Sequence, residues 1–402
     1  MTDIHKKATF LVLSVLFLQL SCMKAFANAT VVHESSAFQA LREKRFFVVK
    51  LTQPHLVLST SKINGGMSTD VQYLVNHQSM EPNFHQEKVD LILNSALGSY
   101  HTQIAKRLDM PPEQMALMGT AAHITNLAHK QRRFKDLTVD AFVTAGVSGN
   151  AMRAGEETQW YQTEQGNRKV DYQGTINIIV LINQPLSPGA LSKASMLLTE
   201  GKSSALSQLA VPSRYGKHLA TGTGTDQFII AAPQAGQDSF VYHSASGHLK
   251  LGELIGSAVR EATLEAILWQ NRLAPEDTAT LTHALGRFGF TEDVLLAHLK
   301  KRMDKNSYTL AKHNVKAIVG NTRVVAAAYA YATLLDRLQY QTLPEGMRAE
   351  VLRDSAATAA VALSGDTLHW SHAWQNIAAP VEDSLGYFFD ALAMGWQAKW
   401  QD

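Results

Sequence analysis

Polar side chains that could do chemistry gather in short, turn-rich segments at the ends of expected strands. The first, residues 144–156 (TAGVSGNAMRAGE), offers the Thr144 hydroxyl, the Asn150 amide and glycines that allow close approach to the backbone. Strand-to-helix turns also use Gly and Asn for purely structural reasons. Because open α/β sheets bind ligands at the ends of their strands, this segment is a candidate part of a site.

The second segment, residues 199–206 (TEGKSSAL), lies within an expected helix. Residues three and four apart share a helix face, so Lys202 and Ser203 lie on the side of Thr199, whereas Glu200 points elsewhere. A glutamate on a helix is also commonly a solvated charge. The segment supplies Lys202 and Glu200 as candidate proton donors and acceptors.

The third segment, residues 221–226 (TGTGTD), comes immediately before an expected strand. Gly222 and Gly224 leave backbone N–H groups free to point into a site, and threonine hydroxyls alternate with them. Asp226 can orient a donor or accept a proton. A glycine-rich loop without further function has the same pattern.

The fourth segment, residues 247–256 (GHLKLGELIG), opens a long amphipathic helix with His248, Lys250 and Glu253. His248 is the most attractive general acid or base by residue type, because the imidazole of histidine titrates near neutrality. A histidine near a helix start is often only a cap or a surface group.

The elements that must position these groups alternate between short apolar runs and stretches of helical period from Phe46 to about Leu273. This alternation predicts an α/β or α+β domain with a mixed sheet flanked by helices. Residues 175–182 are apolar almost throughout, which predicts a central strand covered on both faces. The expected strands are Phe46–Leu51, His55–Ser59, Thr138–Ala145, Thr175–Ile182 and Gln227–Ala231.

Two helices are expected in this domain, and a helical region follows it. Ser187 and Pro188 form a helix start, with a capping hydroxyl and a proline at the first helical position, and this helix should reach about Leu209. Apolar residues at three-and-four spacing between positions 251 and 267 predict the second helix. Strand patterns stop after Pro275. We therefore expect a domain over residues 28–273 and an all-α C-terminal extension over residues 274–402.

The first 27 residues have the pattern of a secretory signal peptide, with Lys6 and Lys7, an apolar stretch, and a small-x-small site ending at Ala27. The apolar stretch is shorter than a membrane-spanning helix, and we expect no transmembrane segment in the mature chain. The sequence thus predicts export to the periplasm after cleavage near Ala27. Lipidation at Cys22 is the minor alternative, because Gln19 stands where a lipobox has leucine.

Composition excludes several classes of protein. The chain of 402 residues is 46% hydrophobic and 18% charged, which is typical of a folded globular protein. Its formal charge of +2 falls to zero when residues 1–27 are removed, so no electrostatic attraction to nucleic acid is expected. Cys22 is the single cysteine. The mature chain therefore has no disulfide, no thiolate nucleophile and no cysteine metal ligand.

The four segments, together with residues 174–180 (GTINIIV) and 59–66 (STSKINGG), resemble the adenosylcobinamide amidohydrolase family in order and spacing across about Val48 to Leu268. The resemblance implies hydrolysis of the amide that joins the corrin ring to aminopropanol or its phosphate, giving adenosylcobyric acid for cobalamin salvage. The substrate is then the corrinoid, and no cofactor is required. The matching polar positions are Asn64, Thr144, Asn150, Asn177, Glu200, Lys202, Thr221, Thr223, Asp226, His248 and Glu253.

Two features depart from the family pattern. Alanine is more usual in the family at the position of Gly201, and the helical extension after Pro275 is additional. Most members look cytoplasmic, whereas this chain begins with an export signal. The protein would then meet scavenged corrinoids before uptake, and the corrinoid uptake machinery is an expected partner.

Hydrolysis of an unactivated amide needs a nucleophile, donors for the oxyanion and an acid for the amine. Without cysteine, the nucleophile is water or a hydroxyl. We expect Asp226 or Glu200 to activate it, Asn150 and the backbone N–H groups of 222–225 to hold the oxyanion, and His248 or Lys202 to protonate the amine. The substrate-binding candidates are Asn64, Gly65, Gly66, Thr144, Asn177, Thr221, Gly222, Thr223 and Glu253.

A metal-assisted route is the rival mechanism, since His248, Glu253, Glu200 and Asp226 could supply ligands, although they form no compact metal motif. His369 and His372 have ligand spacing on a helix, but an exposed polar face explains them better. We therefore assign no metal-binding residues, although the use of a divalent metal ion by the enzyme remains an alternative.

Two other classes of function remain open. The first is a non-catalytic corrinoid carrier of the cell envelope. The second is a partner-binding role of the C-terminal helices, where Trp370, Trp374, Trp396 and Trp400 could form a docking stripe, although helical aromatics more often belong to a core. A corrin pocket should combine aromatic surface with fixed polar groups. The aromatic candidates are Trp160, Tyr161, Tyr172 and Trp269.

Overall fold

The structure is a computed structural model. It describes residues 28–79, 98–157, 162–163, 166–167, 174–237, 239–378 and 383–400. The predicted signal peptide and the aromatic candidates Trp160, Tyr161 and Tyr172 lie outside these ranges. The described residues form two compact units, one within 1–207 and 220–272 and the other within 208–219 and 273–402. The short segment 208–219 thus clusters with the second unit, although the expected domain boundary places it in the first.

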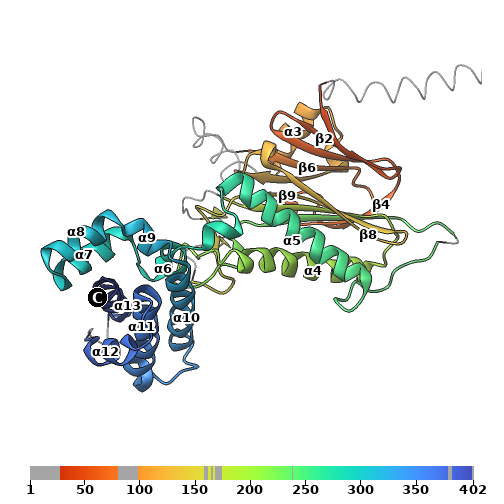
Figure 1. Cartoon of the computed structure of the whole chain (residues 1–402). Coiled ribbons are helices and arrows are strands. Elements are labelled where there is room, and N and C mark those ends of the chain that lie inside the picture. The colour runs from red at the N-terminus through yellow and green to blue at the C-terminus, as the bar shows by residue number, and fades with distance from the viewer. Residues whose placement is uncertain are drawn as a thin grey trace, which may run out of the picture. The chain divides into compact units, whose positions relative to one another are not determined.

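The first unit contains two large β-sheets flanked by helices, as Figure 1 shows, and two-stranded pairings of β10 (Ala151–Met152) with β14 (Gly222–Thr223) and of β11 (Gln162–Thr163) with β12 (Gly166–Asn167). One sheet has the strand order β1-β2-β3-β6-β7 and the other β5-β4-β15-β13-β9-β8. The β6–β7 and β13–β15 pairs are parallel, and the other neighbours in both sheets are antiparallel. The strands are β1 (Thr30–Glu34), β2 (Phe38–Glu43), β3 (Phe46–Leu51), β4 (His55–Ser59), β5 (Gly66–Ser68), β6 (Tyr73–Gln78), β7 (Met115–Thr120), β8 (Ala128–Phe134), β9 (Leu137–Ala145), β13 (Ile176–Ile182) and β15 (Gln227–Pro233).

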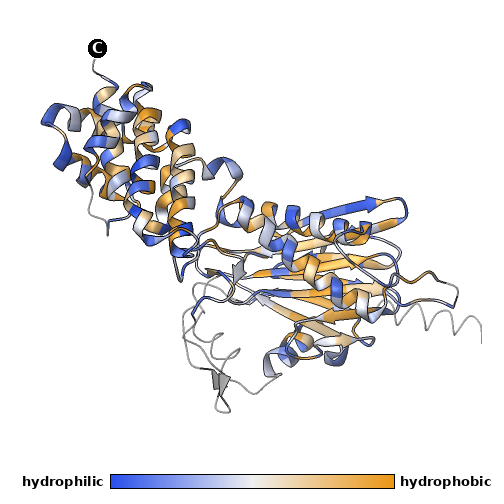
Figure 2. Ribbon diagram, turned by 90° about the horizontal axis from the view of Figure 1, so that it is seen from below, coloured by the Kyte–Doolittle hydropathy of each residue, from blue (hydrophilic) through white to orange (hydrophobic). Residues whose placement is uncertain are grey.

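Apolar side chains from both sheets form the central core between them. Phe47 and Leu74 of the first sheet share this cluster with Phe142, Ile179 and Ile229 of the second. The outer face of the first sheet packs on helix α3 (Ser99–Leu108). Helices α4 (Pro188–Gln208) and α5 (Lys250–Asn271) lie on the outer side of the second sheet (Figure 1). In Figure 2 the strands of this unit are mostly orange, whereas its helices carry both orange and blue residues. The layers are helix, sheet, sheet and helices.

The predicted fold class is confirmed, and so are its main elements. β13 is buried along its whole length and lies between β15 and β9, as its continuous apolar pattern predicts. The Ser187 hydroxyl accepts a hydrogen bond from the Ala190 N–H at 3.2 Å and starts α4 as expected. The expected strands fall in two packed sheets, because β1, β2, β6, β7 and β8 add pairings that the sequence pattern alone did not reveal.

The second unit is helical, with a core between α10, α11 and α13. Trp396 belongs to this core, Trp374 is half-buried with its Nε1 bonded to Asp354, and Trp400 is 57% exposed. The four tryptophans therefore do not form one continuous exposed stripe. The helices are α6 (Leu281–Leu285), α7 (Glu292–Arg302), α8 (Lys305–His313), α9 (Val315–Val319), α10 (Thr322–Gln339), α11 (Arg348–Ser364), α12 (His369–Asn376) and α13 (Gly386–Ala398).

A buried carboxylate joins α13 to α7 in this unit. Arg302 donates to both oxygens of Asp390 at 2.7 and 2.6 Å, and His298 Nε2 lies 2.6 Å from Oδ1. Burial raises the pKa of Asp390, but hydrogen bonds from His298, the Ala378 N–H and Arg302 outweigh burial and hold it below its usual value. The ionised group therefore contributes to stability above the carboxyl pKa of the unfolded chain, about 3.9.

Replacement of Asp390 should reveal this contribution. We expect Asp390→Asn to lower the free energy of unfolding at pH 7 by about 2 kcal/mol, because it leaves the Arg302 guanidinium without its carboxylate. The difference from the wild type should vanish as the pH falls through the lowered pKa of Asp390. Denaturant unfolding of residues 28–402 at pH 7 and pH 3 measures it, with the exposed Asp293→Asn as control. A difference independent of pH would contradict this account.

Candidate active site at one end of the sheets

Strand ends from both sheets meet at one end of the sandwich. β13 and β15 begin there, and β9 ends there, so that Asn177 lies opposite Thr144 on one side and Gln227 on the other. The ends of β6 and β7 reach the same place, because Asn177 Nδ2 donates to Asn76 Oδ1 at 2.9 Å and to the Gly119 carbonyl at 3.0 Å. Polar groups from two sheets are thus held together at this end.

The central feature of this end is a hydrogen-bonded cluster around Asp226. Lys202 Nζ lies 2.5 Å from Asp226 Oδ2, and the Thr223 hydroxyl donates to Oδ1 at 2.5 Å. The backbone N–H groups of Thr223 and Ile176 also donate to this carboxylate, each at 3.1 Å. One carboxylate therefore fixes an ammonium group and a hydroxyl beside each other.

The cluster is largely removed from solvent. The side chains of Lys202 and Asp226 are 11% and 18% exposed. A charge pair in such surroundings interacts more strongly than one in bulk water, because the local dielectric constant is lower. Gly222 makes room for the pair: a Cβ there would overlap the Asp226 carboxylate and lie 2.5 Å from Lys202 Nζ.

Helix α4 brings Lys202 and Ser203 to the 221–226 loop. The Ser203 hydroxyl donates to the Thr221 carbonyl at 2.8 Å, while the Thr221 hydroxyl accepts from the Ala154 N–H at 2.9 Å. Gly201 lets the helix sit close to α5, because a Cβ at this position would lie 2.6 Å from the Gly256 carbonyl oxygen. The contact between α4 and α5 therefore explains a glycine at position 201, where alanine is expected from the resemblance.

Asn150 is fully buried and ties three loops together. Its side-chain Nδ2 donates to the Gly174 carbonyl at 3.1 Å and lies 3.3 Å from Thr225 Oγ1. The backbone carbonyl of Asn150 accepts a hydrogen bond from the Gly224 N–H at 3.3 Å. These bonds engage the side-chain amide of Asn150 and hold the loops around Asp226 together. The role of Asn150 toward an oxyanion stays a prediction.

Thr144 and Asn177 lie in a buried network beside this cluster. Asn76 Nδ2 donates to Thr144 Oγ1 at 2.9 Å. Within the described part of the chain, Asn177 Oδ1 is buried and has no hydrogen-bond partner. This oxygen is an acceptor that a water molecule or a ligand N–H could satisfy.

The 59–66 segment lies at a neighbouring position and has its own structural explanation. Asn64 has a φ of 56°, and its Nδ2 donates to the carbonyls of Pro112 and Met115 at 2.7 and 2.9 Å. Gly65 passes so close to the Ser61 carbonyl that a Cβ would overlap it, and Gly66 has a φ of 80°. These residues hold the turn between β4 and β5.

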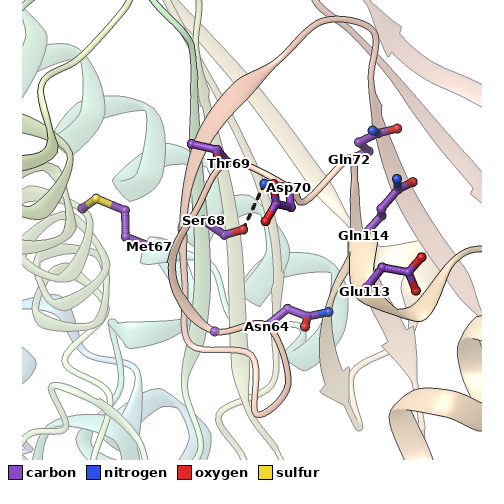
Figure 3. A pocket seen from close by; sticks show the side chains of 9 residues that line it. Asn64, Met67, Ser68, Thr69, Asp70, Gln72, Glu113 and Gln114 are labelled. Atoms are coloured by element: carbon purple, nitrogen blue, oxygen red, sulfur yellow. Dashed lines mark hydrogen bonds between the residues drawn. The ribbon is translucent and has the colours of Figure 1, made fainter.

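An open polar cavity of about 640 Å³ lies beside this turn. Figure 3 shows Asn64 at its edge, with Asp70, Gln72 and Glu113 around it. Its other lining residues are Gly65, Met67, Ser68, Thr69 and Gln114. The cavity-lining Gln114 directly precedes Met115, the first residue of β7, whereas Gly119, which bonds Asn177, lies four residues further along this strand. Four residues of a strand span about 13 Å, so the cavity lies away from the Asp226 cluster.

Three predicted site residues are not brought to Asp226. Glu200 is exposed on α4, about 200° around the helix from Lys202. His248 is exposed just before α5, and Glu253 pairs with Lys250 at 2.7 Å in its first turn. The opposite end of α5 is the one near the site, because Asn271 accepts a hydrogen bond from the Val147 N–H just after the end of β9. Glu253 lies about 27 Å from Asn271 along the helix. Roles for these three residues stay predictions.

The structure adds residues that sequence reasoning missed. Asn76 bonds both Asn177 and Thr144, and Gln227 Oε1 accepts from the Gly119 N–H at 3.2 Å. Gln227 is a polar residue at the start of the otherwise apolar strand β15, whereas Asn76 opens the polar half of β6. Only the position of Gln227 is a usable signal in the sequence, because a polar side chain at the start of an apolar strand requires partners.

Comparison with known proteins gives this arrangement a family. Residues 28–275 match the model of the adenosylcobinamide amidohydrolase family. An uncharacterized protein of Methanocaldococcus jannaschii is 31% identical over 243 residues, which are 58% of this chain and 89% of the relative.

Two solved structures also align, with low scores. A beta-aminopeptidase from a Burkholderia species matches with a TM-score of 0.29 and 17% identity, over 60% of this chain and 82% of that one. The PH0078 protein of Pyrococcus horikoshii has a TM-score of 0.28 and 10% identity, over 60% and 83%. The family match instead spans more than half of the chain and includes the whole Asp226 cluster. The chain belongs to the adenosylcobinamide amidohydrolase family.

Proposed function

We propose that this protein hydrolyses the amide bond linking aminopropanol, or its phosphate, to the corrin ring of adenosylcobinamide. The products are adenosylcobyric acid and the free amine. The observation that carries the proposal is the partly buried cluster of Lys202, Asp226 and Thr223 within the region that matches the family. It combines an ammonium, a carboxylate and a hydroxyl, which are groups that amide hydrolysis uses.

Each member of the cluster has a role in the proposed reaction. The carbonyl oxygen of the amide gains negative charge during attack, and the Lys202 ammonium is the donor placed to stabilise it and then to protonate the departing amine. The Asp226 carboxylate holds that ammonium and accepts the proton of the attacking group. The attacking oxygen belongs to the Thr223 hydroxyl or to a water molecule beside it. Accumulation of an acyl-enzyme on Thr223, detectable by mass spectrometry, would distinguish the first from the second.

Two of the backbone N–H groups first expected in the oxyanion site are used inside the protein. The Thr223 N–H donates to Asp226, and the Gly224 N–H donates to the Asn150 carbonyl. We therefore assign the main electrostatic role to Lys202. Asn150, Thr144 and Thr221 position the loops around it.

We also propose that the mature protein acts in the periplasm. This proposal rests on the signal-peptide pattern of residues 1–27, with a lipid anchor on Cys22 as the minor alternative. None of the helices in the described part of the chain is long and apolar enough to cross a membrane. An exported enzyme of this kind would act on scavenged corrinoids and would work beside corrinoid uptake machinery.

Incubation of the mature chain, residues 28–402, with adenosylcobinamide tests the activity. We expect release of aminopropanol and appearance of adenosylcobyric acid by mass spectrometry, both with and without a chelator. Product only without chelator would favour the metal-assisted route. Tight corrinoid binding without product would instead favour a carrier function and overturn the proposed reaction.

A further inference from the structure

A second group of potential ligands lies at a different position between the two sheets. His33 on β1, His129 on β8 and Asp140 on β9 place one ligand atom each within 4.8 Å of one another. We propose that these three side chains bind a divalent transition-metal ion such as Zn²⁺. Asp140 and Thr144 are four residues apart on β9, about 13 Å, so this position is separate from the Asp226 cluster.

The separations of the ligand atoms suit a metal ion. His129 Nε2 lies 2.8 Å from Asp140 Oδ1, and His33 Nε2 lies 3.6 Å from the same oxygen. Zinc bonds to nitrogen and oxygen are about 2.0–2.2 Å long, so tetrahedral ligands lie about 3.3 Å apart. The two observed distances fall on either side of that value.

The surrounding structure aims these side chains at one point. The β1–β2 register shifts between Val31 and His33, and a bulge of this kind redirects the side chain that follows it. The His129 ring stacks on Phe142, with centroids 4.3 Å apart and planes 8° apart. Gln131 Nε2 donates to Asp140 Oδ1 at 3.0 Å, as residues around metal ligands commonly do.

Charge gives an independent argument. Asp140 is only 4% exposed, and a buried carboxylate requires a cationic partner. Among the residues that the structure describes, its charge partners are the two histidines, which are cationic only when protonated. The nearby Lys130 and Arg132 of β8 pair instead with Glu265 and Glu261 of α5. A metal dication would neutralise the carboxylate while both imidazoles stay neutral.

Two histidines and one carboxylate form a common ligand set for zinc and related divalent metals. The ion would link the first strand of one sheet to the edge strand β8 of the other and to its neighbour β9. This role is structural, so it does not depend on the proposed hydrolysis.

Metal binding by the full mature chain tests the proposal. After chelator treatment and its removal, calorimetric titration with Zn²⁺ should show one saturable site, and Co²⁺ should give ligand-field absorption in the visible range. His33→Gln should weaken Zn²⁺ binding more than about 100-fold, because it removes a ligand rather than an outer support. The exposed His243→Gln is the matched control and should keep the wild-type affinity.

Gln131→Ala keeps all three ligands and provides a milder test, with Zn²⁺ binding expected to weaken about 10-fold. Zn²⁺ should also raise the melting temperature of the wild type but not that of His33→Gln. Absence of a saturable site in the wild type, or unchanged affinity in His33→Gln, would show a hydrogen-bonded histidine–carboxylate cluster and overturn the proposal. None of these readouts depends on corrinoid turnover.

Discussion

Asp226→Asn is expected to lower kcat for adenosylcobinamide hydrolysis by about 10³-fold. Asparagine retains one acceptor oxygen but turns an NH₂ group toward donors that now bond the carboxylate, namely Lys202, the Thr223 hydroxyl and two backbone N–H groups. It also leaves the Lys202 ammonium without its counter-charge. Steady-state release of aminopropanol by the purified variant measures the loss.

Two controls separate this effect from a general loss of structure. Asp136→Asn changes an exposed aspartate of the same unit and should keep kcat within about twofold. The circular dichroism spectrum of Asp226→Asn should match that of the wild type at the assay temperature. A folded Asp226→Asn protein with wild-type turnover would remove Asp226 from the mechanism.

The same assay decides between the two carboxylates that the sequence offered. Glu200→Gln should leave kcat close to that of the wild type, because Glu200 is exposed on the opposite side of α4 from Lys202. A loss of turnover in Glu200→Gln that equals the loss in Asp226→Asn would contradict the assignment of the site to the Lys202 face of the helix.

The sequence predicted the elements that carry a clear local pattern. β13 was predicted from its continuous apolar run, and the start of α4 from Ser187 and Pro188. Most of the first sheet was missed for a physical reason. β6 ends in Asn76, His77 and Gln78, whose polar side chains are nonetheless buried, so no simple alternation of apolar and polar residues marks this strand.

Edge strands were equally hard to recognise. β8 contains Lys130 and Arg132, which pair with Glu265 and Glu261 on the polar side of α5. The charged side chains of β8 are therefore neutralised by carboxylates of α5. Such compensation is visible only when the two segments, more than 100 residues apart, are brought together.

The candidate site shows the same limit. The motifs supplied both Lys202 and Asp226, but these residues are 24 positions apart, and only the packing of α4 on the second sheet joins them. Helical spacing separated Glu200 from the face of Lys202 but did not show which of the two faces meets residues 221–226. His248 was chosen for its residue type. Residue type identifies the available chemistry, whereas the choice among candidates requires tertiary contacts.

Gly222→Ala is the second variant with a large expected effect. A methyl group at this position would overlap the Asp226 carboxylate and lie 2.5 Å from Lys202 Nζ, so the ion pair would have to separate. We expect a loss in kcat of about 10²-fold and a decrease of about 2 kcal/mol in the free energy of unfolding, because the side chain is forced into a packed, charged environment. Gly189→Ala, where a Cβ meets nothing within 4 Å, is the matched control and should not destabilise the protein.

A double-mutant cycle shows whether the methyl group acts through the ion pair. Lys202→Met should itself reduce kcat about 10²-fold or more, because it removes the ammonium. If Gly222→Ala acts by separating Lys202 from Asp226, its effect should largely disappear in the Lys202→Met background, where no pair remains to be separated. Equal effects of Gly222→Ala in both backgrounds would mean that it distorts the 221–226 loop in some other way. The non-additivity thus measures how far the glycine serves the charge pair, which neither single variant can show alone.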